Sequence, residues 1–170
     1  MRILSLLLIT SFVVSSCSSD FAKILKSKDY EYKLKKADEY FYKKKYNQAE
    51  QLYVELFPVF KGTQKFEDLY YKYAYCSYFQ KNYEDAENLF KGFLEVFPNS
   101  PKEEEMAYMH AYMYYLQSPK IELEQTNTSR VIGMMQTFIN THPNSSRLKS
   151  AFEVIDKSRA KLELKEYKAA

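Results

Sequence analysis

The chain has 170 residues, and 25 Lys and Arg residues nearly balance 22 Asp and Glu residues, for a formal net charge of +3. This length suits one domain or an array of small repeats, and so small a net charge argues against nucleic acid as a partner. Only three residues are Gly, which argues against Gly-rich phosphate loops and sheets with many tight turns, whereas 17 Tyr and 12 Phe make the chain unusually aromatic. We therefore expect an all-α fold.

Residues 1–16 have the pattern of a secretory signal peptide. Arg2 precedes an apolar run of about a dozen residues, which is shorter than the roughly 20 that a membrane-spanning helix needs. The run ends in Val14-Ser15-Ser16-Cys17, which resembles the lipobox of bacterial lipoproteins. That resemblance implies that Cys17 is the lipid attachment site and carries acyl chains such as palmitate, which anchor stably when several are present. The alternative is an ordinary cleaved signal peptide with an incidental cysteine.

A lipidated tether is expected over residues 17–28, followed by a tetratricopeptide-repeat domain over residues 29–170. The tether region contains few apolar residues, so we expect little packing from it. Ser18 and Ser19 follow the cysteine, without an acidic run. Similar lipoproteins with these features stay on the periplasmic side of the outer membrane. The expected location is therefore the periplasmic face of the outer membrane, with the protein anchored by lipid.

The remainder of the chain repeats itself. Segments 46–53 and 83–90 are identical at four of eight positions and lie 37 residues apart. A third copy follows with an eight-residue insertion around residues 118–128. The period and the small residues, such as Ala37 and Ala74, resemble the tetratricopeptide repeat, in which each unit is a pair of antiparallel helices. The expected fold is an α-solenoid of three helix pairs and a terminal helix.

The repeat alignment predicts seven helices, with units at about 29–60, 65–98 and 101–143 and a terminal helix at 145–167. The individual helices are expected at 29–44, 47–57, 65–80, 83–97, 101–117, 128–141 and 145–167. Pro98 and Pro143 follow the second helices of their units, where proline ends a helix. The terminal helix either caps the array or begins a fourth unit, because an end repeat otherwise leaves an apolar face exposed.

Many of the aromatic residues fall on one face of the predicted array. The first helix of each pair lines a concave groove in tetratricopeptide proteins, and counting from the small residue of each first helix assigns several rings to that groove. These peptide- or partner-groove residues are Tyr71, Tyr75, Tyr78, Phe79, Tyr108, Tyr112 and Tyr115. Tyrosine offers a rigid ring and one hydroxyl, which suits a surface that holds a peptide. The alternative is that the rings pack between neighbouring repeats.

Two further motifs narrow the resemblance. They are Leu123-Glu124-Gln125-Thr126-Asn127-Thr128 in the insertion and Pro143-Asn144-Ser145 after the sixth helix. Together with the lipobox and the repeats, they are similar to the BamD family, the tetratricopeptide-repeat lipoproteins of the outer-membrane β-barrel assembly machinery. The sequence of these motifs resembles Bacteroidetes-like versions of the family most. Members usually have more repeats, so we expect this chain to be short at its C-terminus.

The resemblance implies a noncatalytic scaffold that supports insertion of outer-membrane proteins. Its implied partners are the periplasmic domains of a BamA-like β-barrel insertase, other assembly subunits, and unfolded outer-membrane protein clients with C-terminal aromatic signals. The lipid anchor adds the membrane itself as a partner. A generic periplasmic tetratricopeptide adaptor lipoprotein, for example in cell-wall synthesis, is the alternative function.

No constellation of residues predicts catalysis, a cofactor or a metal site. His110 and His142 are the only histidines, and neither has ligand-type neighbours at metal-binding spacing, so we expect structural or surface roles for both. Lys43-Lys44-Lys45 gives the first helix a basic end. A solvated helix C-terminus and contact with anionic lipid explain this run about equally well.

Overall fold

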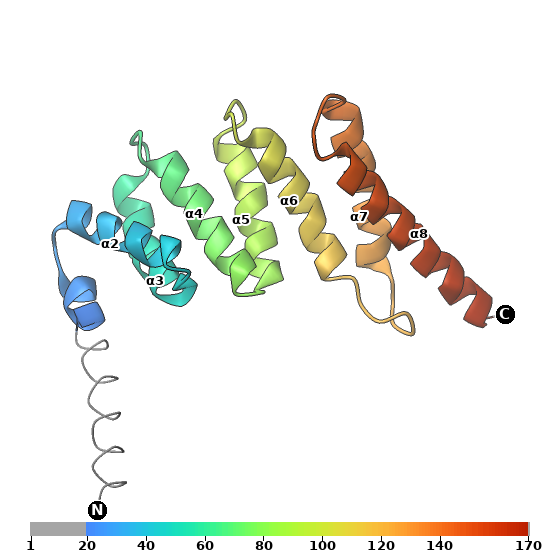
Figure 1. Cartoon of the computed structure of the whole chain (residues 1–170), viewed down its shortest axis with the longest axis horizontal. Helices are drawn as coiled ribbons and strands as arrows, with labels where there is room; N and C mark the ends of the chain where they lie inside the picture. Colours follow the sequence, from blue (N-terminus) through green and yellow to red (C-terminus); the bar gives the residue numbers. More distant parts are fainter. Residues whose placement is uncertain (1–19, 170) are drawn as a thin grey trace, which may run out of the picture. The chain divides into compact units, whose positions relative to one another are not determined.

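The computed structural model describes residues 20–169, and all the regular secondary structure within this range is helical (Figure 1). The helices are α2 (Tyr30–Tyr42), α3 (Tyr46–Phe60), α4 (Phe66–Phe79), α5 (Tyr83–Val96), α6 (Glu103–Leu116), α7 (Thr126–Thr141) and α8 (Leu148–Ala169). Residues 20–26 are also helical. The expected signal peptide and the lipid attachment site at Cys17 lie outside the described residues. The chain divides into two compact units, residues 1–69 and 70–170.

In the first unit, α2 and α3 form a closely packed pair. The side chain of Asp29 caps α2 by accepting a 2.9 Å hydrogen bond from the backbone N–H of Tyr32. Ala37 and Ala49 are fully buried, so the two helices can approach closely at these small residues. Tyr53 is also fully buried, and its hydroxyl donates a 2.7 Å hydrogen bond to Asp38. The pair therefore has the packing expected of one tetratricopeptide unit.

In the second unit, α4 packs on α5 through aromatic rings. The ring centroids of Tyr70 and Phe93 lie 5.8 Å apart, and those of Tyr75 and Phe90 lie 5.4 Å apart. Tyr70 also crosses α5 at Gly92, where a Cβ atom would lie 2.2 Å from the Tyr70 hydroxyl oxygen. Glycine at this position therefore makes room for the ring. Beyond this pair, α5 packs on α6, α6 on α7, and α7 on α8.

The insertion between α6 and α7 is a closed loop held by Gln125. This side chain is buried, and its Nε2 donates hydrogen bonds of 2.8 and 2.9 Å to the carbonyl oxygens of Lys120 and Leu123. Its Oε1 accepts a 2.7 Å bond from the Thr128 hydroxyl. Lys161 of α8 binds the other side of the loop, donating a 2.6 Å bond to the Ser118 hydroxyl. The insertion motif thus has a structural role, since it connects the third helix pair to α8.

The predicted fold class is confirmed, because three helix pairs are followed by one terminal helix. The bounds agree with the predicted ranges to within three residues. The helix α3 continues through Pro58 to Phe60 rather than stopping at residue 57, since a proline in the last turn interrupts few helical hydrogen bonds. The helix α8 begins at Leu148 rather than at residue 145, because Ser145 forms a preceding turn in which its hydroxyl accepts a 3.0 Å bond from the Arg147 N–H.

Residues 20–26 differ from the expected tether because they are helical and pack on the first helix pair. Ile24 is only 6% exposed, and the Phe21 ring meets the Tyr40 ring edge-on with 5.5 Å between centroids. The buried ammonium group of Lys33 donates a 2.8 Å hydrogen bond to the carbonyl oxygen of Leu25. Phe21, Ile24 and Leu25 follow helical spacing, but the surrounding serines and lysines mask this short apolar pattern.

No helix among residues 20–169 combines the length and the apolar character that a membrane crossing requires.

Candidate functional site

The predicted groove residues lie on two helices of the second unit, α4 and α6. We call this set the aromatic surface: Tyr71, Tyr75, Tyr78, Phe79, Tyr108, Tyr112 and Tyr115. Successive rings contact one another along each helix. On α4 the centroids of Tyr71 and Tyr75 lie 4.7 Å apart, and on α6 Tyr112 stacks on Tyr108 at 5.7 Å and on Tyr115 at 5.5 Å. Each helix therefore presents a continuous row of rings, as the spacing of three and four residues predicts.

A single carboxylate, that of Glu105, joins the two rows. Its Oε1 accepts a 2.6 Å hydrogen bond from the Tyr75 hydroxyl, and its Oε2 lies 3.4 Å from the Tyr71 hydroxyl. Arg147, just before α8, forms an ion pair with the same carboxylate at 3.2 Å. Burial and the bond to Glu105 raise the pKa of Tyr75 far above its usual value, so this hydroxyl stays a protonated donor. Glu105 therefore fixes α4, α6 and the start of α8 to one another.

Burial divides the aromatic surface into two groups. Tyr75 is 9% exposed and Tyr108 is 5% exposed, so these two rings serve mainly as packing. Tyr108 packs edge-on against Phe138, with 5.5 Å between ring centroids, and its hydroxyl lies 2.8 Å from the Ser150 hydroxyl. For these two expected groove residues, the alternative that the rings pack between neighbouring repeats therefore fits better than exposure in a groove.

The other rings reach the surface and are available to a ligand. They are Tyr71, Tyr78, Tyr112 and Tyr115, which are partly exposed, and Phe79, which is 44% exposed. Two cations border the aromatic surface, one at a partly exposed ring and one at a buried ring. The Lys102 ammonium lies 5.4 Å from the Tyr71 ring centroid, and the Arg147 guanidinium lies 5.4 Å from the Tyr108 centroid. Such a surface offers flat apolar contacts, phenolic hydroxyls and positive charge at its edge, which are the groups that an extended aromatic peptide requires.

The two histidines lie on a different part of the second unit, around a cavity of about 340 Å³ between α6 and α7. His110 lies 2.8 Å from Glu87, which also accepts a 3.0 Å hydrogen bond from the Tyr114 hydroxyl. Burial lowers the pKa of His110 despite this carboxylate. His142 lies 3.6 Å from Glu103. Sequence reasoning missed the shared cavity, because His110 lies in α6 and His142 lies just after the end of α7, so only the folded pair brings them together.

Within the described range, no group of three or more His, Cys, Asp and Glu side chains is arranged to hold a metal ion. What this unit presents chemically is a row of partly exposed aromatic rings on each of α4 and α6.

The fold is that of an all-α protein of the tetratricopeptide-repeat class. A family model described as YfiO, outer membrane lipoprotein, matches residues 27–170. The chain therefore belongs to the YfiO family, which is the BamD family that the lipobox, repeats and insertion motif resemble. No curated protein matches the chain.

Proposed function

We propose that this protein is a noncatalytic scaffold of the β-barrel assembly machinery, attached through acyl chains on Cys17 to the periplasmic face of the outer membrane. The observation that carries the proposal is the family match over residues 27–170, which includes all the helix pairs. As a scaffold, the chain binds the periplasmic domains of a BamA-like insertase and other assembly subunits. In this role it supports the insertion of outer-membrane proteins.

We further propose that the aromatic surface receives unfolded clients through their C-terminal aromatic signals. The exposed ring of Phe79 and the partly exposed rings of Tyr112 and Tyr115 supply the contact area. The buried rings of Tyr75 and Tyr108 contact Phe79 and Tyr112, respectively, each with 5.7 Å between centroids. Their hydroxyls form hydrogen bonds with Glu105 and Ser150. A surface that is ordered before binding loses little conformational entropy when the peptide arrives, which favours affinity for a weakly structured ligand.

Partner identity is tested by co-purification of the full chain from detergent-solubilised membranes. We expect a BamA-like barrel protein to elute with it in stoichiometric amount. Enrichment of cell-wall synthases in place of the barrel protein would contradict the assembly role and favour the periplasmic adaptor.

Client binding is tested with a fluorescent peptide that ends in phenylalanine and a matched peptide that ends in alanine. The double variant Tyr112→Ala/Tyr115→Ala should bind the first peptide about tenfold more weakly, a loss of about 1.4 kcal/mol. The matched control is Tyr167→Ala, which removes an 82%-exposed ring from α8 outside the aromatic surface. Equal affinity of all three proteins, or equal binding of both peptides, would argue against client recognition here.

A further inference from the structure

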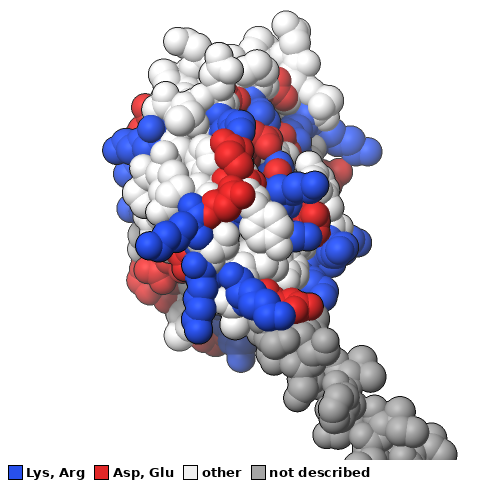
Figure 2. Space-filling view, turned by 90° about the vertical axis from the view of Figure 1, so that its left-hand side faces the viewer, with Lys and Arg blue, Asp and Glu red and all other residues white. Residues whose placement is uncertain are grey.

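Positive charge is concentrated near the N-terminal end of the described chain. Residues 20–45 contain nine lysines against five acidic residues, a net charge of +4, whereas residues 46–170 contain 15 basic against 17 acidic residues, a net charge of −2. Figure 2 shows Lys and Arg side chains on the face that carries α2 and residues 20–26, mixed with acidic side chains. The small net charge of the whole chain therefore combines a basic N-terminal region, residues 20–45, with a slightly acidic region, residues 46–170.

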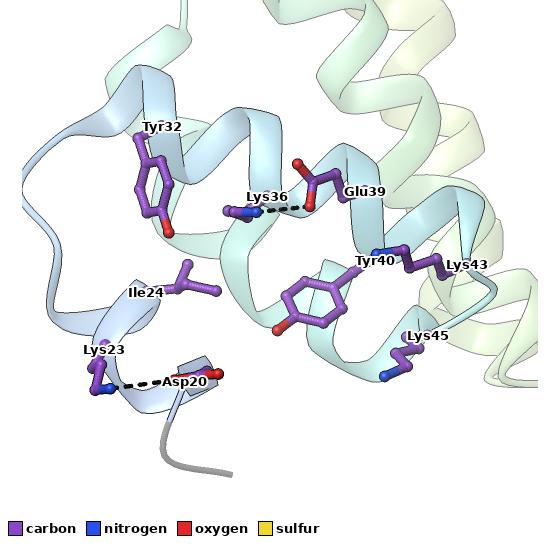
Figure 3. Close-up of a pocket in the computed structure, with 9 residues that line it drawn as sticks. All are labelled: Asp20, Lys23, Ile24, Tyr32, Lys36, Glu39, Tyr40, Lys43 and Lys45. Atoms are coloured by element: carbon purple, nitrogen blue, oxygen red, sulfur yellow. Dashed lines mark hydrogen bonds and ion pairs between the residues drawn. The ribbon is translucent and has the colours of Figure 1, made fainter. Parts of the chain in front are cut away.

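A cavity of about 370 Å³ lies in this basic region, between residues 20–26 and α2 (Figure 3). Its polar lining consists of four lysines, two tyrosines and two carboxylates, namely Lys23, Lys36, Lys43, Lys45, Tyr32, Tyr40, Asp20 and Glu39. We call this cavity the lysine pocket. The run of lysines at the end of α2 thus contributes Lys43 and Lys45 to a defined hollow rather than only to a solvated helix end.

Lysines outnumber carboxylates in the lining of the lysine pocket. Its two carboxylates are each bound to a lysine of the pocket, Asp20 to Lys23 at 3.2 Å and Glu39 to Lys36 at 2.8 Å. Four lysines therefore line the pocket together with two carboxylates, and a predominantly basic lining suits an anionic group such as a phosphate.

The tyrosines of the pocket contribute both apolar rings and hydroxyl groups to its lining. Tyr32 is 41% exposed, and in Figure 3 the rings of Tyr32 and Tyr40 lie on either side of Ile24, which is 6% exposed. The Lys36 ammonium lies 5.7 Å from the Tyr32 ring centroid, and the Lys45 ammonium lies 5.9 Å from that of Tyr40. Tyrosine and lysine, which each combine an apolar body with a polar tip, are typical of protein surfaces at the lipid headgroup layer.

The sequence also limits how far the lysine pocket lies from the expected anchor. Asp20 follows Cys17 by three residues, so their Cα atoms are at most about 11 Å apart in any conformation. If Cys17 is lipidated and its acyl chains lie in the membrane, Asp20 lies no farther than about 11 Å from the anchored residue, a distance comparable with the Debye length of about 8 Å.

From these observations we propose that the lysine pocket binds the phosphate of an anionic phospholipid headgroup in the leaflet that holds the Cys17 acyl chains. The proposal rests on the proposed lipid anchoring and deepens it, because a headgroup in the pocket gives the first unit a fixed face toward the membrane.

The test measures lysine acetylation rates by mass spectrometry on the full lipidated chain in vesicles of phosphatidylcholine, with and without phosphatidylglycerol. Phosphatidylglycerol should slow acetylation of Lys36, Lys43 and Lys45 severalfold. Lys149 and Lys157, which are exposed on α8, serve as internal references and should be unaffected. About 1 M NaCl should abolish the protection, because the Debye length falls to about 3 Å.

A charge variant and its matched control separate the pocket from general electrostatics. In Lys43→Gln/Lys45→Gln, protection of Lys36 by phosphatidylglycerol should disappear, whereas Lys149→Gln/Lys157→Gln should retain it. Equal rates on both vesicle types would overturn the proposal. Equal protection by inorganic phosphate on phosphatidylcholine vesicles would also overturn it, because the ligand would then be free phosphate.

The same spectra report whether Cys17 carries acyl chains. A Cys17 peptide without acyl chains would overturn the anchoring proposal together with this one. An acylated Cys17 peptide without protection of the pocket lysines would overturn only the headgroup site.

Discussion

The hydroxyl of the buried Tyr75 in α4 donates a 2.6 Å hydrogen bond to the carboxylate of Glu105 in α6. It connects the first helices of two successive repeats. Tyr75 also packs edge-on against Phe90 of α5, so one residue contributes to both the helix pair and the contact between pairs.

Substitution of Tyr75 should affect stability before it affects binding. Tyr75→Phe keeps the ring and loses the bond to Glu105, which should lower the free energy of unfolding by about 1–3 kcal/mol. Tyr75→Ala also leaves a cavity and should cost about 3–5 kcal/mol. Urea denaturation of both variants measures these losses. A Tyr75→Ala variant as stable as the unsubstituted protein would show that the ring does not support the fold.

Gly92 and Tyr70 should be strongly coupled. Gly92→Ala places a Cβ atom 2.2 Å from the Tyr70 hydroxyl oxygen but 3.4 Å from the ring carbon that carries it, so the hydroxyl is the main obstacle. Alone, Gly92→Ala should destabilise the protein by about 1–3 kcal/mol. In a Tyr70→Phe background the same change should stabilise by up to about 1 kcal/mol, because alanine favours a helix more than glycine does.

Thermal unfolding of the four proteins in this double-mutant cycle gives the coupling energy. Gly133→Ala in α7 is the matched control, since nothing lies within 4 Å of its Cβ position. An identical effect of Gly92→Ala in both backgrounds would refute the close approach.

Protonation of His110 should destabilise the fold. Burial lowers its pKa in the folded protein below the value of about 6.5 in an unfolded chain, so the unfolded state binds more protons as the pH falls. The free energy of unfolding should therefore decrease from pH 7.5 to pH 5.5, and His110→Gln should flatten this dependence. Melting temperatures across this range provide the measurement.

His142→Gln provides the comparison for that experiment, because it removes the other histidine of the same cavity and leaves His110 in place. It should retain the pH dependence. A pH dependence that persists in His110→Gln and vanishes in His142→Gln would contradict this prediction, because the titrating residue would then be His142.

Loss of the Lys33 ammonium should release residues 20–26 from the first helix pair. Lys33 is 3% exposed and binds both the Leu25 carbonyl oxygen, at 2.8 Å, and Glu55, at 2.5 Å. Lys33→Met keeps the stem and removes both bonds, so amide hydrogen exchange at residues 23–27 should accelerate by tenfold or more, corresponding to about 1.4 kcal/mol. Lys35→Met, an exposed neighbour on α2, should leave the exchange unchanged.

The repeated small residues predict the fold because each one is required where the two helices of a unit cross closely. Ala37, Ala74 and Ala111 lie 37 residues apart, and each is at most 1% exposed, since every unit has the same close helix crossing. The sequence also placed the rings correctly on α4 and α6. Their roles were not predictable from the repeat.

The equivalent positions of successive repeats show why. Tyr71 and Tyr108 occupy one repeat position, yet only Tyr108 is buried; Tyr75 and Tyr112 occupy the next, yet only Tyr75 is buried. Burial depends on what the neighbouring helices present. Glu105 and the α5 rings cover Tyr75, whereas Phe138 covers Tyr108. Such contacts join residues tens of positions apart, which spacing within one helix does not reveal.

The bond from Lys33 to the Leu25 carbonyl also determines how mechanical load enters the fold. Tension on the N-terminal end of the described chain reaches α2 at Lys33, near its start, and passes through Glu55 to α3. The force is therefore shared between two helices instead of peeling α2 away one turn at a time. Because Lys33 holds a backbone oxygen, this mechanical link does not depend on which side chain occupies position 25.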